Sequence, residues 1–309
     1  MSAESGASRP TPAWDHPLPD PAVLRTTEGW IAYGTGMRTD SGAIPAAISE
    51  DLVHWEGIGE VLRPLPEELG DSYWAPEVCE RDGSWWMYFS VGHGDRGHHL
   101  RVARAERPEG PFQDLGVNLT PSETFAIDAS PFRDEDGSWW LYFARDVLDT
   151  DRVGTHLAVA PLPAPDRLGE TTPVLAPYAD WQIFQRDREM YGQTYTWHTL
   201  EGPHLLVRDG LLCMSFSAGN WTGAGYRTAW AHATTPTGPW TLPTEGEDVL
   251  LASDAQWIGP GHNSFTIGPD GEDVIVFHAW DEERTGRYMH LRPLQVATDP
   301  PRLQVSMGQ

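Results

Sequence analysis

The chain has 309 residues and a formal net charge of −24, and it contains 15 Trp, 31 Gly and 27 Pro. The length fits two average domains or one large β domain, and the Gly, Pro and Trp content favours an all-β fold with many turns. The negative charge argues against nucleic acid or an anionic membrane as a partner, because both bind basic patches. It also disfavours acidic substrates, so we expect a neutral ligand, and abundant indole rings suit stacking against sugars.

The N-terminal residues 1–13 are mostly small and polar, which predicts a disordered or extended segment ahead of one domain over residues 14–309. This segment lacks the apolar core of a signal peptide, and the sequence has no apolar run long enough to span a membrane. We therefore expect a cytoplasmic protein, although a chain cut after a leader would show the same pattern. Cys79 and Cys213 lie far apart in strand-like surroundings, which predicts buried free thiols.

A turn followed by an apolar strand recurs along the chain. Its copies, in order, begin at Glu28-Gly29, Asp82-Gly83, Asp136-Gly137, Asp209-Gly210 and Gly271. The second and third copies are nearly identical, DGSWWMYF and DGSWWLYF, and Asp-Gly before such a strand is a strong hairpin signal. A second sequence echo, a shorter repeated motif, appears at residues 107–112 (RPEGPF) and 235–240 (TPTGPW). Five repeats with short strands predict an all-β, five-bladed β-propeller in a single domain.

Each repeat has a strand before its turn, and in a propeller this innermost strand lines the central channel. These strands begin near residues 20, 75, 128, 201 and 262, and each start carries an ionisable side chain: Asp20, Glu77, Asp128, Glu201 and His262. A polar residue that satisfies a neighbouring backbone group explains one or two of them. Taken singly, Glu201 before Gly202-Pro203 also fits a surface turn and Asp128 fits an Asx-turn. Five ionisable residues that converge on one axis favour a functional site there.

Several carboxyl groups beside aromatic walls indicate acid–base chemistry on a neutral ligand. Glycoside hydrolysis needs one protonated carboxylic acid for the leaving oxygen and one ionised carboxylate on the other face of the sugar. Crowded like charges raise the pKa of at least one carboxyl group, which keeps an acid protonated near neutral pH.

The segments Asp20-Pro21, 127–132 (IDASPF) and 201–204 (EGPH) resemble the three acid motifs of glycoside hydrolase family 43. Residues 74–78 (WAPEV) and 259–264 (GPGHNS) are similar to two further family motifs, and the resemblance spans residues 14–305 in the family's order. Members of that family are five-bladed propellers that include arabinanases, α-L-arabinofuranosidases and β-xylosidases.

The resemblance implies an inverting mechanism. Asp20 would be the general base, Asp128 would tune and orient the acid, and Glu201 would be the general acid. Asp15 competes for the role of base, but Asp20 has the family's Asp-Pro form and opens the first strand. Retaining fructan-cleaving propellers share the fold, and their Asn-Asp-Pro, Arg-Asp-Pro and Glu-Cys motifs do not occur here.

His262 matches a family histidine that helps to hold an axial Ca²⁺ or Na⁺, mostly through waters. Calcium prefers oxygen ligands, so a single His predicts a water-rich, structural ion, and a histidine hydrogen-bonded in the core is the alternative. The chemistry itself is expected to require no cofactor.

We expect Trp74, Glu77, Trp197 and Arg287 to bind substrate, although an exposed strand charge also explains Arg287. The long aromatic insertion 178–199 and its neighbouring motifs resemble the exo-acting arabinofuranosidase branch most, with a neutral oligosaccharide as substrate. The alternatives are a β-D-xylosidase, a non-catalytic sugar-binding propeller and a protein-interaction platform. The sequence leaves the oligomeric state open.

Overall fold

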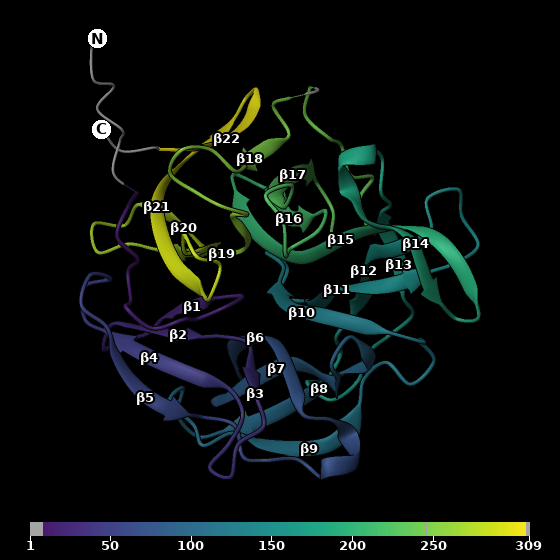
Figure 1. Ribbon diagram of the computed structural model, residues 1–309. Coiled ribbons are helices and arrows are strands. Elements are labelled where there is room, and N and C mark those ends of the chain that lie inside the picture. Colours follow the sequence, from purple (N-terminus) through teal and green to yellow (C-terminus); the bar gives the residue numbers. More distant parts are fainter. Residues whose placement is uncertain (1–8, 245, 307–309) are drawn as a thin grey trace.

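The structure is a computed structural model that describes residues 9–244 and 246–306. The described residues form strands and two short 3₁₀ helices, Glu67–Leu69 and Asp180–Gln182, and they contain no α-helix. The strands form five blades around one axis (Figure 1), which confirms the predicted all-β propeller. Residues 1–8 of the predicted N-terminal segment lie outside the described residues, whereas Ala13 already donates its N–H to Met289 O at 2.8 Å.

Each blade is built around an antiparallel meander of four strands in chain order, and the first strand of the meander lies nearest the axis. Blade 1 contains β1 (Ala22–Arg25), β2 (Trp30–Tyr33), β4 (Pro45–Ser49) and β5 (Glu56–Glu60); blade 2 contains β6 (Ser72–Arg81), β7 (Ser84–His93), β8 (Arg96–Ala105) and β9 (Gln113–Asn118), with β3 (Gly36–Met37) beside β6. Blade 3 contains β10 (Ala126–Arg133), β11 (Trp139–Val147), β12 (Gly154–Pro161) and β13 (Thr172–Leu175). Blade 4 contains β15 (Gln193–Arg208), β16 (Leu211–Ala218), β17 (Arg227–Ala233) and β18 (Val249–Leu251), with β14 (Ile183–Met190) beside β15; blade 5 contains β19 (Gly261–Ile267), β20 (Asp273–Trp280), β21 (Arg287–Thr298) and β22 (Pro301–Val305).

The repeated Asp-Gly pairs form the turns between the first and second strands, as predicted. Asp82 and Gly83 connect β6 to β7 with φ values of 54° and 71°, and Asp209 and Gly210 connect β15 to β16 with φ values of 50° and 74°. Two consecutive left-handed residues are what a tight hairpin turn requires, and Asp followed by Gly adopts them at low cost. This turn lies at the far end of the blade from the start of the innermost strand, so the turn between the second and third strands returns to that start.

Tyrosines on the second strands tie neighbouring blades together. Three hydroxyl groups donate to backbone carbonyls of the next blade, namely Tyr33 to Pro108 at 2.7 Å, Tyr88 to Pro165 at 3.1 Å and Tyr142 to Pro236 at 2.7 Å. Two of these acceptors belong to the second sequence echo, residues 107–112 and 235–240. The echo therefore marks a loop that receives a hydrogen bond from the preceding blade.

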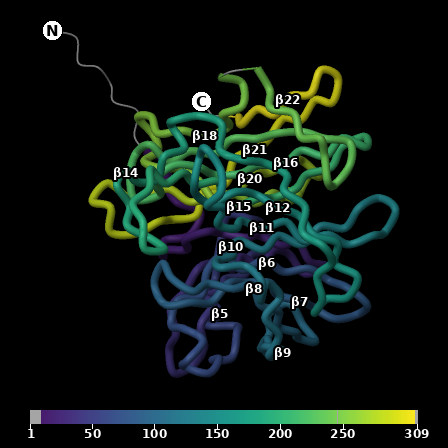
Figure 2. The backbone as a smooth tube through the Cα atoms, turned by 90° about the vertical axis from the view of Figure 1, so that its right-hand side faces the viewer, coloured from purple at the N-terminus to yellow at the C-terminus, as the bar shows by residue number. Residues whose placement is uncertain are grey.

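The ring closes between blades 1 and 5 without exchanging a strand, because the strands of blade 1 all come from residues 22–60 and those of blade 5 all come from residues 261–305. Leu18 N–H donates to Arg287 O at 3.0 Å, and Trp30 Nε1 donates to Ile267 O at 2.9 Å. Apolar side chains of both blades, including Val23 and Val276, form one buried cluster. Figure 2 shows the order of the chain from the side, with the purple and blue blades at one end and the green and yellow blades at the other.

The insertion 178–199 forms the β14–β15 hairpin, which extends blade 4 beyond its inner strand. At its base, Gly154 and Thr155 of β12 pair in parallel with His198 and Thr199, so blades 3 and 4 share one sheet. A Cβ on Gly154 would lie 1.9 Å from His198 O, and its φ is 150°, so only glycine fits this junction. The hairpin lies on the right of Figure 1, beside β12 and β13.

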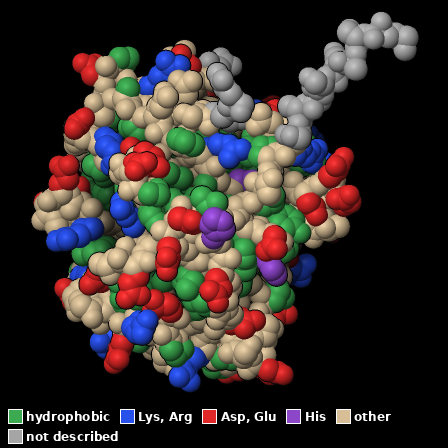
Figure 3. Space-filling model, turned by 90° about the vertical axis from the view of Figure 1, so that its left-hand side faces the viewer, with side chains coloured by type: hydrophobic (Ala, Val, Ile, Leu, Met, Phe, Trp, Pro, Cys, Tyr) green, Lys and Arg blue, Asp and Glu red, His purple; other side chains and the backbone are tan. Residues whose placement is uncertain are grey.

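Within the described residues, no helix is long and apolar enough to cross a membrane. Cys79 and Cys213 are free, as expected, with Cys213 buried and Cys79 half-buried. Figure 3 shows the molecule from the left-hand side of Figure 1, where acidic side chains are dispersed among fewer basic ones.

Candidate active site

The innermost strands share a backbone irregularity near their first residues. One residue in or just ahead of each has a positive φ: Asp20 (54°), Ala75 (44°), Asp128 (61°), Gly202 (57°) and His262 (46°). In β6, β10, β15 and β19 this residue falls within a break in register against the second strand. Such bulges redirect side chains, and strained non-glycine residues gather at functional sites. The repeat therefore places five residues with positive φ around the axis.

Asp20 is buried against groups from blades 1 and 5. Arg287 Nη1 donates to Asp20 Oδ1 at 2.8 Å, and Thr35 Oγ1 donates to Oδ2 at 2.5 Å. The backbone N–H of Asp20 donates to His278 Nδ1 at 3.1 Å, and His262 Nδ1 lies 3.5 Å from Oδ1. Burial opposes ionisation of Asp20, but the Arg287 guanidinium, with smaller contributions from the two imidazoles, holds the pKa well below its usual value. Asp20 is thus ionised at neutral pH.

Arg287 is itself held against a pair of indole rings. Its guanidinium carbon lies 4.7 Å from the ring centroid of Trp221 and 5.9 Å from that of Trp280. The two indoles are stacked at 5.9 Å, and Trp280 Nε1 donates to Trp221 O at 2.9 Å. Cation–π contact of this kind fixes a guanidinium plane, so the pair directs the charge of Arg287 at Asp20.

Glu201 has the opposite electrostatic environment. Its carboxyl group accepts a hydrogen bond from the buried Tyr226 hydroxyl. Burial raises the pKa of Glu201 to about 7, and the charge of Asp20 adds to this effect, while the Tyr226 hydroxyl and Arg287 counteract part of it. Glu201 therefore retains a proton in a large fraction of molecules near neutral pH, while the residue keeps some exposure to solvent.

Asp128 lies beside Glu201. Its Oδ2 accepts the N–H of Gly202 at 2.8 Å, which ties it to the residue that follows the acid. Burial and the Glu201 carboxylate both raise the pKa of Asp128 well above its usual value. The two carboxyl groups form a coupled pair that resists losing both protons. Ionised Glu201 therefore favours the protonated form of Asp128, and the Gly202 bond places that carboxyl group beside the acid.

Gly202 permits this close arrangement. Its φ is 57°, and a Cβ there would lie 3.3 Å from three atoms of the His262 ring. His262 donates its own N–H to Ser217 Oγ at 2.7 Å, so its ring stands on the axis against the glycine. A larger residue at position 202 would displace either the imidazole or the Asp128 bond.

The axial cavity is small, about 10 Å³, and is lined by Asp20, Glu77, Asp128, His262 and Asn263, among others. Among the described residues, Asn263 Oδ1 is buried and has no hydrogen-bond partner, so it can accept from a donor or a cation. However, within residues 9–244 and 246–306 no group of three or more His, Cys, Asp or Glu side chains is arranged to hold a metal ion. The guanidinium of Arg287 also neutralises the nearest carboxylate. An ion held mostly through waters needs no such group, so the expected Ca²⁺ or Na⁺ ion near His262 stays a prediction.

The expected substrate contacts occupy different positions. Glu77 lies in the axial cavity and pairs with His204 at 3.3 Å. Trp74 is half-buried and stacks on His98 with ring centroids 3.8 Å apart. Trp197 differs from expectation, because it is 1% exposed. Its ring is enclosed by Tyr191, Tyr195 and Arg188, so it supports the hairpin from inside and presents no surface to a sugar.

Several residues at the site have no signal in the sequence repeat. They come from the turns and strand ends that return to the start of the inner strands, and they are Thr35, Trp221, Tyr226, His278 and Trp280. Topology predicts that such segments reach the site, but the repeats differ there in length and composition. Asp15, the alternative base, is exposed and contacts His16 at 2.7 Å, away from this group.

The comparisons with known proteins bear on the family and the fold. The family model for glycosyl hydrolases family 43 matches residues 10–300. The β-D-galactofuranosidase xynD of Aspergillus niger is 32% identical over 246 residues, which cover 74% of this chain and 64% of that enzyme. An extracellular exo-α-(1→5)-L-arabinofuranosidase of Streptomyces chartreusis is 28% identical over 293 residues, which cover 88% of this chain and 84% of that enzyme.

A crystal structure of a thermostable family-43 glycoside hydrolase superposes with a TM-score of 0.80 at 27% identity, covering 94% of this chain and 93% of the other. The chain spans 64% of the Aspergillus niger enzyme's length, so the activity of that whole protein does not transfer directly. The family model nevertheless covers nearly all of the sequence, and the propeller that the family shares is the one observed. The chain belongs to glycosyl hydrolase family 43.

Proposed function

We propose that this glycoside hydrolase releases terminal α-L-arabinofuranosyl units from arabino-oligosaccharides with inversion of configuration. The observation that carries the proposal is the contrast between two carboxyl groups at one site. The pKa of Glu201 is raised to about 7, and that of Asp20 is held well below its usual value. An acid and a base with separated pKa values are what inverting hydrolysis uses.

In the proposed reaction Asp20 removes a proton from a water molecule as the water oxygen attacks the anomeric carbon. Glu201 donates its proton to the glycosidic oxygen as the bond to the leaving sugar breaks. Asp20 then carries a proton and Glu201 is ionised, and exchange with solvent restores both. Asp128 acts as a positioning residue for Glu201, because its Oδ2 accepts the N–H of the next residue, Gly202. No step needs a metal or cofactor.

The sugar is inferred from the relatives. The Streptomyces chartreusis relative is an exo-arabinofuranosidase and the Aspergillus niger relative is a β-D-galactofuranosidase. The rings of α-L-arabinofuranose and β-D-galactofuranose have the same configuration, and galactofuranose carries one additional hydroxymethyl group. A site for one therefore resembles a site for the other. β-D-Galactofuranoside hydrolysis is the second candidate, favoured by the 32% identity of that relative.

A panel of 4-nitrophenyl glycosides tests the proposal: α-L-arabinofuranoside, β-D-galactofuranoside and β-D-xyloside, with arabino- and xylo-oligosaccharides alongside. We expect the arabinofuranoside to be cleaved fastest and arabinose to be released singly. Proton NMR of the first-formed sugar should show the inverted anomer. Xylose as the main product, or retention at the anomeric carbon, contradicts the proposal.

A further inference from the structure

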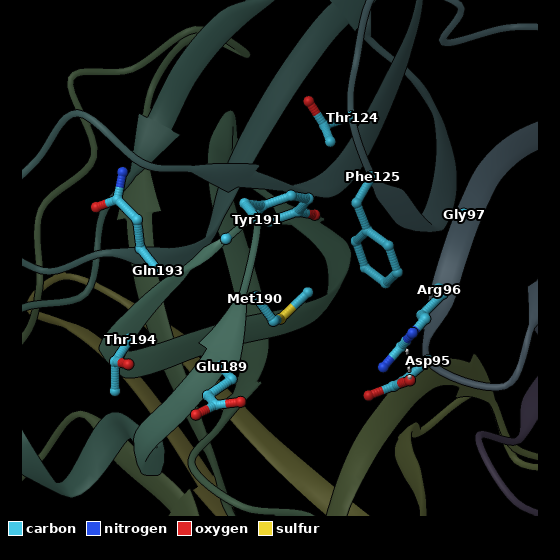
Figure 4. Close-up of a pocket in the computed structure, with 11 residues that line it drawn as sticks. Asp95, Arg96, Gly97, Thr124, Phe125, Glu189, Met190, Tyr191, Gln193 and Thr194 are labelled. Atoms are coloured by element: carbon cyan, nitrogen blue, oxygen red, sulfur yellow. Dashed lines mark ion pairs between the residues drawn. The ribbon is translucent and has the colours of Figure 1, made fainter.

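A cavity of about 630 Å³ lies outside the axial pit, between the tips of two hairpins and the chain before β10 (Figure 4). It is lined by residues 95–97 of the β7–β8 turn, by Thr124 and Phe125, and by residues 189–194 of the β14–β15 hairpin. The proposed roles of Asp20, Asp128 and Glu201 leave this cavity without a function.

The cavity opens on the same end of the propeller as the catalytic carboxyl groups. The β7–β8 turn and the β14–β15 hairpin both lie at the end where the inner strands begin. Phe125 precedes Asp128 by three residues along extended chain, a separation of about 10 Å. Aromatic rings of blade 2 extend this wall. Trp74 stacks on His98 with ring centroids 3.8 Å apart, and His98 meets Phe125 edge-on with ring centroids 5.7 Å apart. The rings of Trp74, His98 and Phe125 thus lie in a row between the axial cavity and this second cavity.

The cavity also lies on the side of Asp128 and away from the base. Asp20 is held by groups of blades 1 and 5, whereas the cavity is formed over blades 2 and 3 and the blade 4 hairpin. In Figure 1 these two regions are on opposite sides of the axis. Attacking water on the Asp20 side places the departing sugar on the other side, because inversion requires attack from the face opposite the leaving group.

The lining suits an uncharged sugar chain. Phe125, Met190 and the 39% exposed Tyr191 present apolar surfaces, and Figure 4 shows Met190 and Phe125 pointing into the same space. Gln193 and Thr194 are exposed and supply neutral hydrogen-bonding groups. The Arg96 guanidinium lies 3.8 Å from Asp95, which offsets its charge. Apolar faces with a few convergent polar groups are the composition of a small-molecule site.

The walls are held in place before any ligand arrives. The Tyr191 hydroxyl donates to Asp146 Oδ2 at 2.6 Å, which joins the hairpin to blade 3. Arg188 donates to Asp95 Oδ2 at 3.1 Å, which joins it to blade 2, and its guanidinium carbon lies 4.8 Å from the Phe184 ring centroid. A preformed site loses little conformational entropy on binding.

We infer that this cavity is a second carbohydrate subsite, which holds the leaving-group portion of a neutral oligosaccharide beyond the unit next to the scissile bond. The inference rests on the proposed function for its choice of sugar. On this inference the β14–β15 insertion sets the enzyme's preference for longer substrates and takes no part in the acid–base chemistry.

Kinetics with substrates of increasing length test the inference. Wild-type kcat/KM should rise from the arabinodisaccharide to the pentasaccharide as the cavity fills. The double variant M190A/Q193A should lose about fivefold or more in kcat/KM on the longer oligosaccharides, a typical effect of truncating contact residues. The same variant should cleave the 4-nitrophenyl arabinofuranoside at the wild-type rate, because that substrate has no sugar beyond the pit, and this rate also shows that the variant is folded.

Q185A is the matched control, since Gln185 is exposed on β14 and does not line the cavity. It should retain wild-type kinetics on every substrate. Equal loss on the aryl glycoside and the oligosaccharides, or no loss on either, overturns the subsite. A failure of the proposed function is separate and visible in the wild type, which would then leave the arabinofuranoside intact. The same length series is in that case run with the sugar that the wild type cleaves.

Discussion

Arg287 donates to Asp20 Oδ1 at 2.8 Å, although 267 positions separate the two residues in the sequence. The bond crosses the seam where the first and last blades meet. Because the Arg287 guanidinium keeps the buried Asp20 ionised, the proposed base acquires its low pKa only when the first and last blades have come together.

The variant R287Q should shift the pH dependence of activity. Arg287 is the main group that lowers the pKa of Asp20, so its loss raises that pKa. The base must be ionised to accept a proton, and the acidic limb of kcat/KM should therefore move to higher pH. Arg292, stacked on Trp257 with its guanidinium carbon 4.9 Å from the ring centroid, supplies the control R292Q, which should leave the limb unchanged. An unshifted limb in R287Q would remove Arg287 from this role.

The basic limb should report Glu201. Its pKa is raised to about 7, and it must hold a proton to act as an acid, so activity should fall as pH rises through about 7. Tyr226 donates to the Glu201 carboxylate and stabilises the ionised form. The variant Y226F should therefore raise the pKa and move the basic limb to higher pH. Y88F, which removes a hydroxyl bonded to Pro165 O between blades, should not move it. A downward shift in Y226F would show that Glu201 is not the titrating group.

Leaving groups should distinguish the acid from the base. E201Q should slow oligosaccharide hydrolysis by about 10²–10⁴-fold, the usual contribution of a general acid. It should slow a 4-nitrophenyl glycoside far less, because that leaving group departs with little protonation. D20N should slow both substrates alike, since water needs a base whichever group leaves, and added azide should restore part of its activity. The opposite pattern of sensitivity would exchange the two roles.

Asp128 should lower the stability of the folded protein at neutral and higher pH, although it is needed for full activity. Its raised pKa means that the folded state binds a proton more tightly than the unfolded state does, so this group lowers stability as pH rises above the unfolded pKa. Asn carries no charge and tolerates the positive φ of 61°. D128N should therefore have a higher Tm than the wild type at pH 8, with the difference shrinking towards pH 4, while its kcat falls. Differential scanning calorimetry at both pH values measures this, and an equal or lower Tm at pH 8 contradicts it.

The tyrosine links between blades should contribute to stability alone. Y142F removes the hydroxyl that donates to Pro236 O at 2.7 Å and leaves that carbonyl without this partner. The expected loss is about 1–3 kcal/mol in the free energy of unfolding, which lowers the Tm by several degrees. The pH profile of kcat/KM should match that of the wild type. An unchanged Tm would show that water replaces the bond.

The sequence by itself determined the propeller and the positions of its inner carboxyl groups. Asp82-Gly83 and Asp209-Gly210 specify their turns locally, since two left-handed residues suit few other pairs, and their recurrence sets the blade count. Asp20, Asp128 and Glu201 are found from the same repeat, because each lies at the start of a strand that must face the axis. These features depend on neighbours a few residues away, which a single sequence displays.

Only the tertiary structure decided what surrounds those carboxyl groups. Tyr226 and Arg287 reach Glu201 and Asp20 from a turn and a strand end whose sequences do not repeat. Trp197 shows the same limit, because an aromatic residue in an insertion fits a sugar platform or a core equally well until its neighbours are placed, and here it is buried. A pKa depends on charge and burial within a few ångströms, and those distances exist only once the first and last blades have closed the ring.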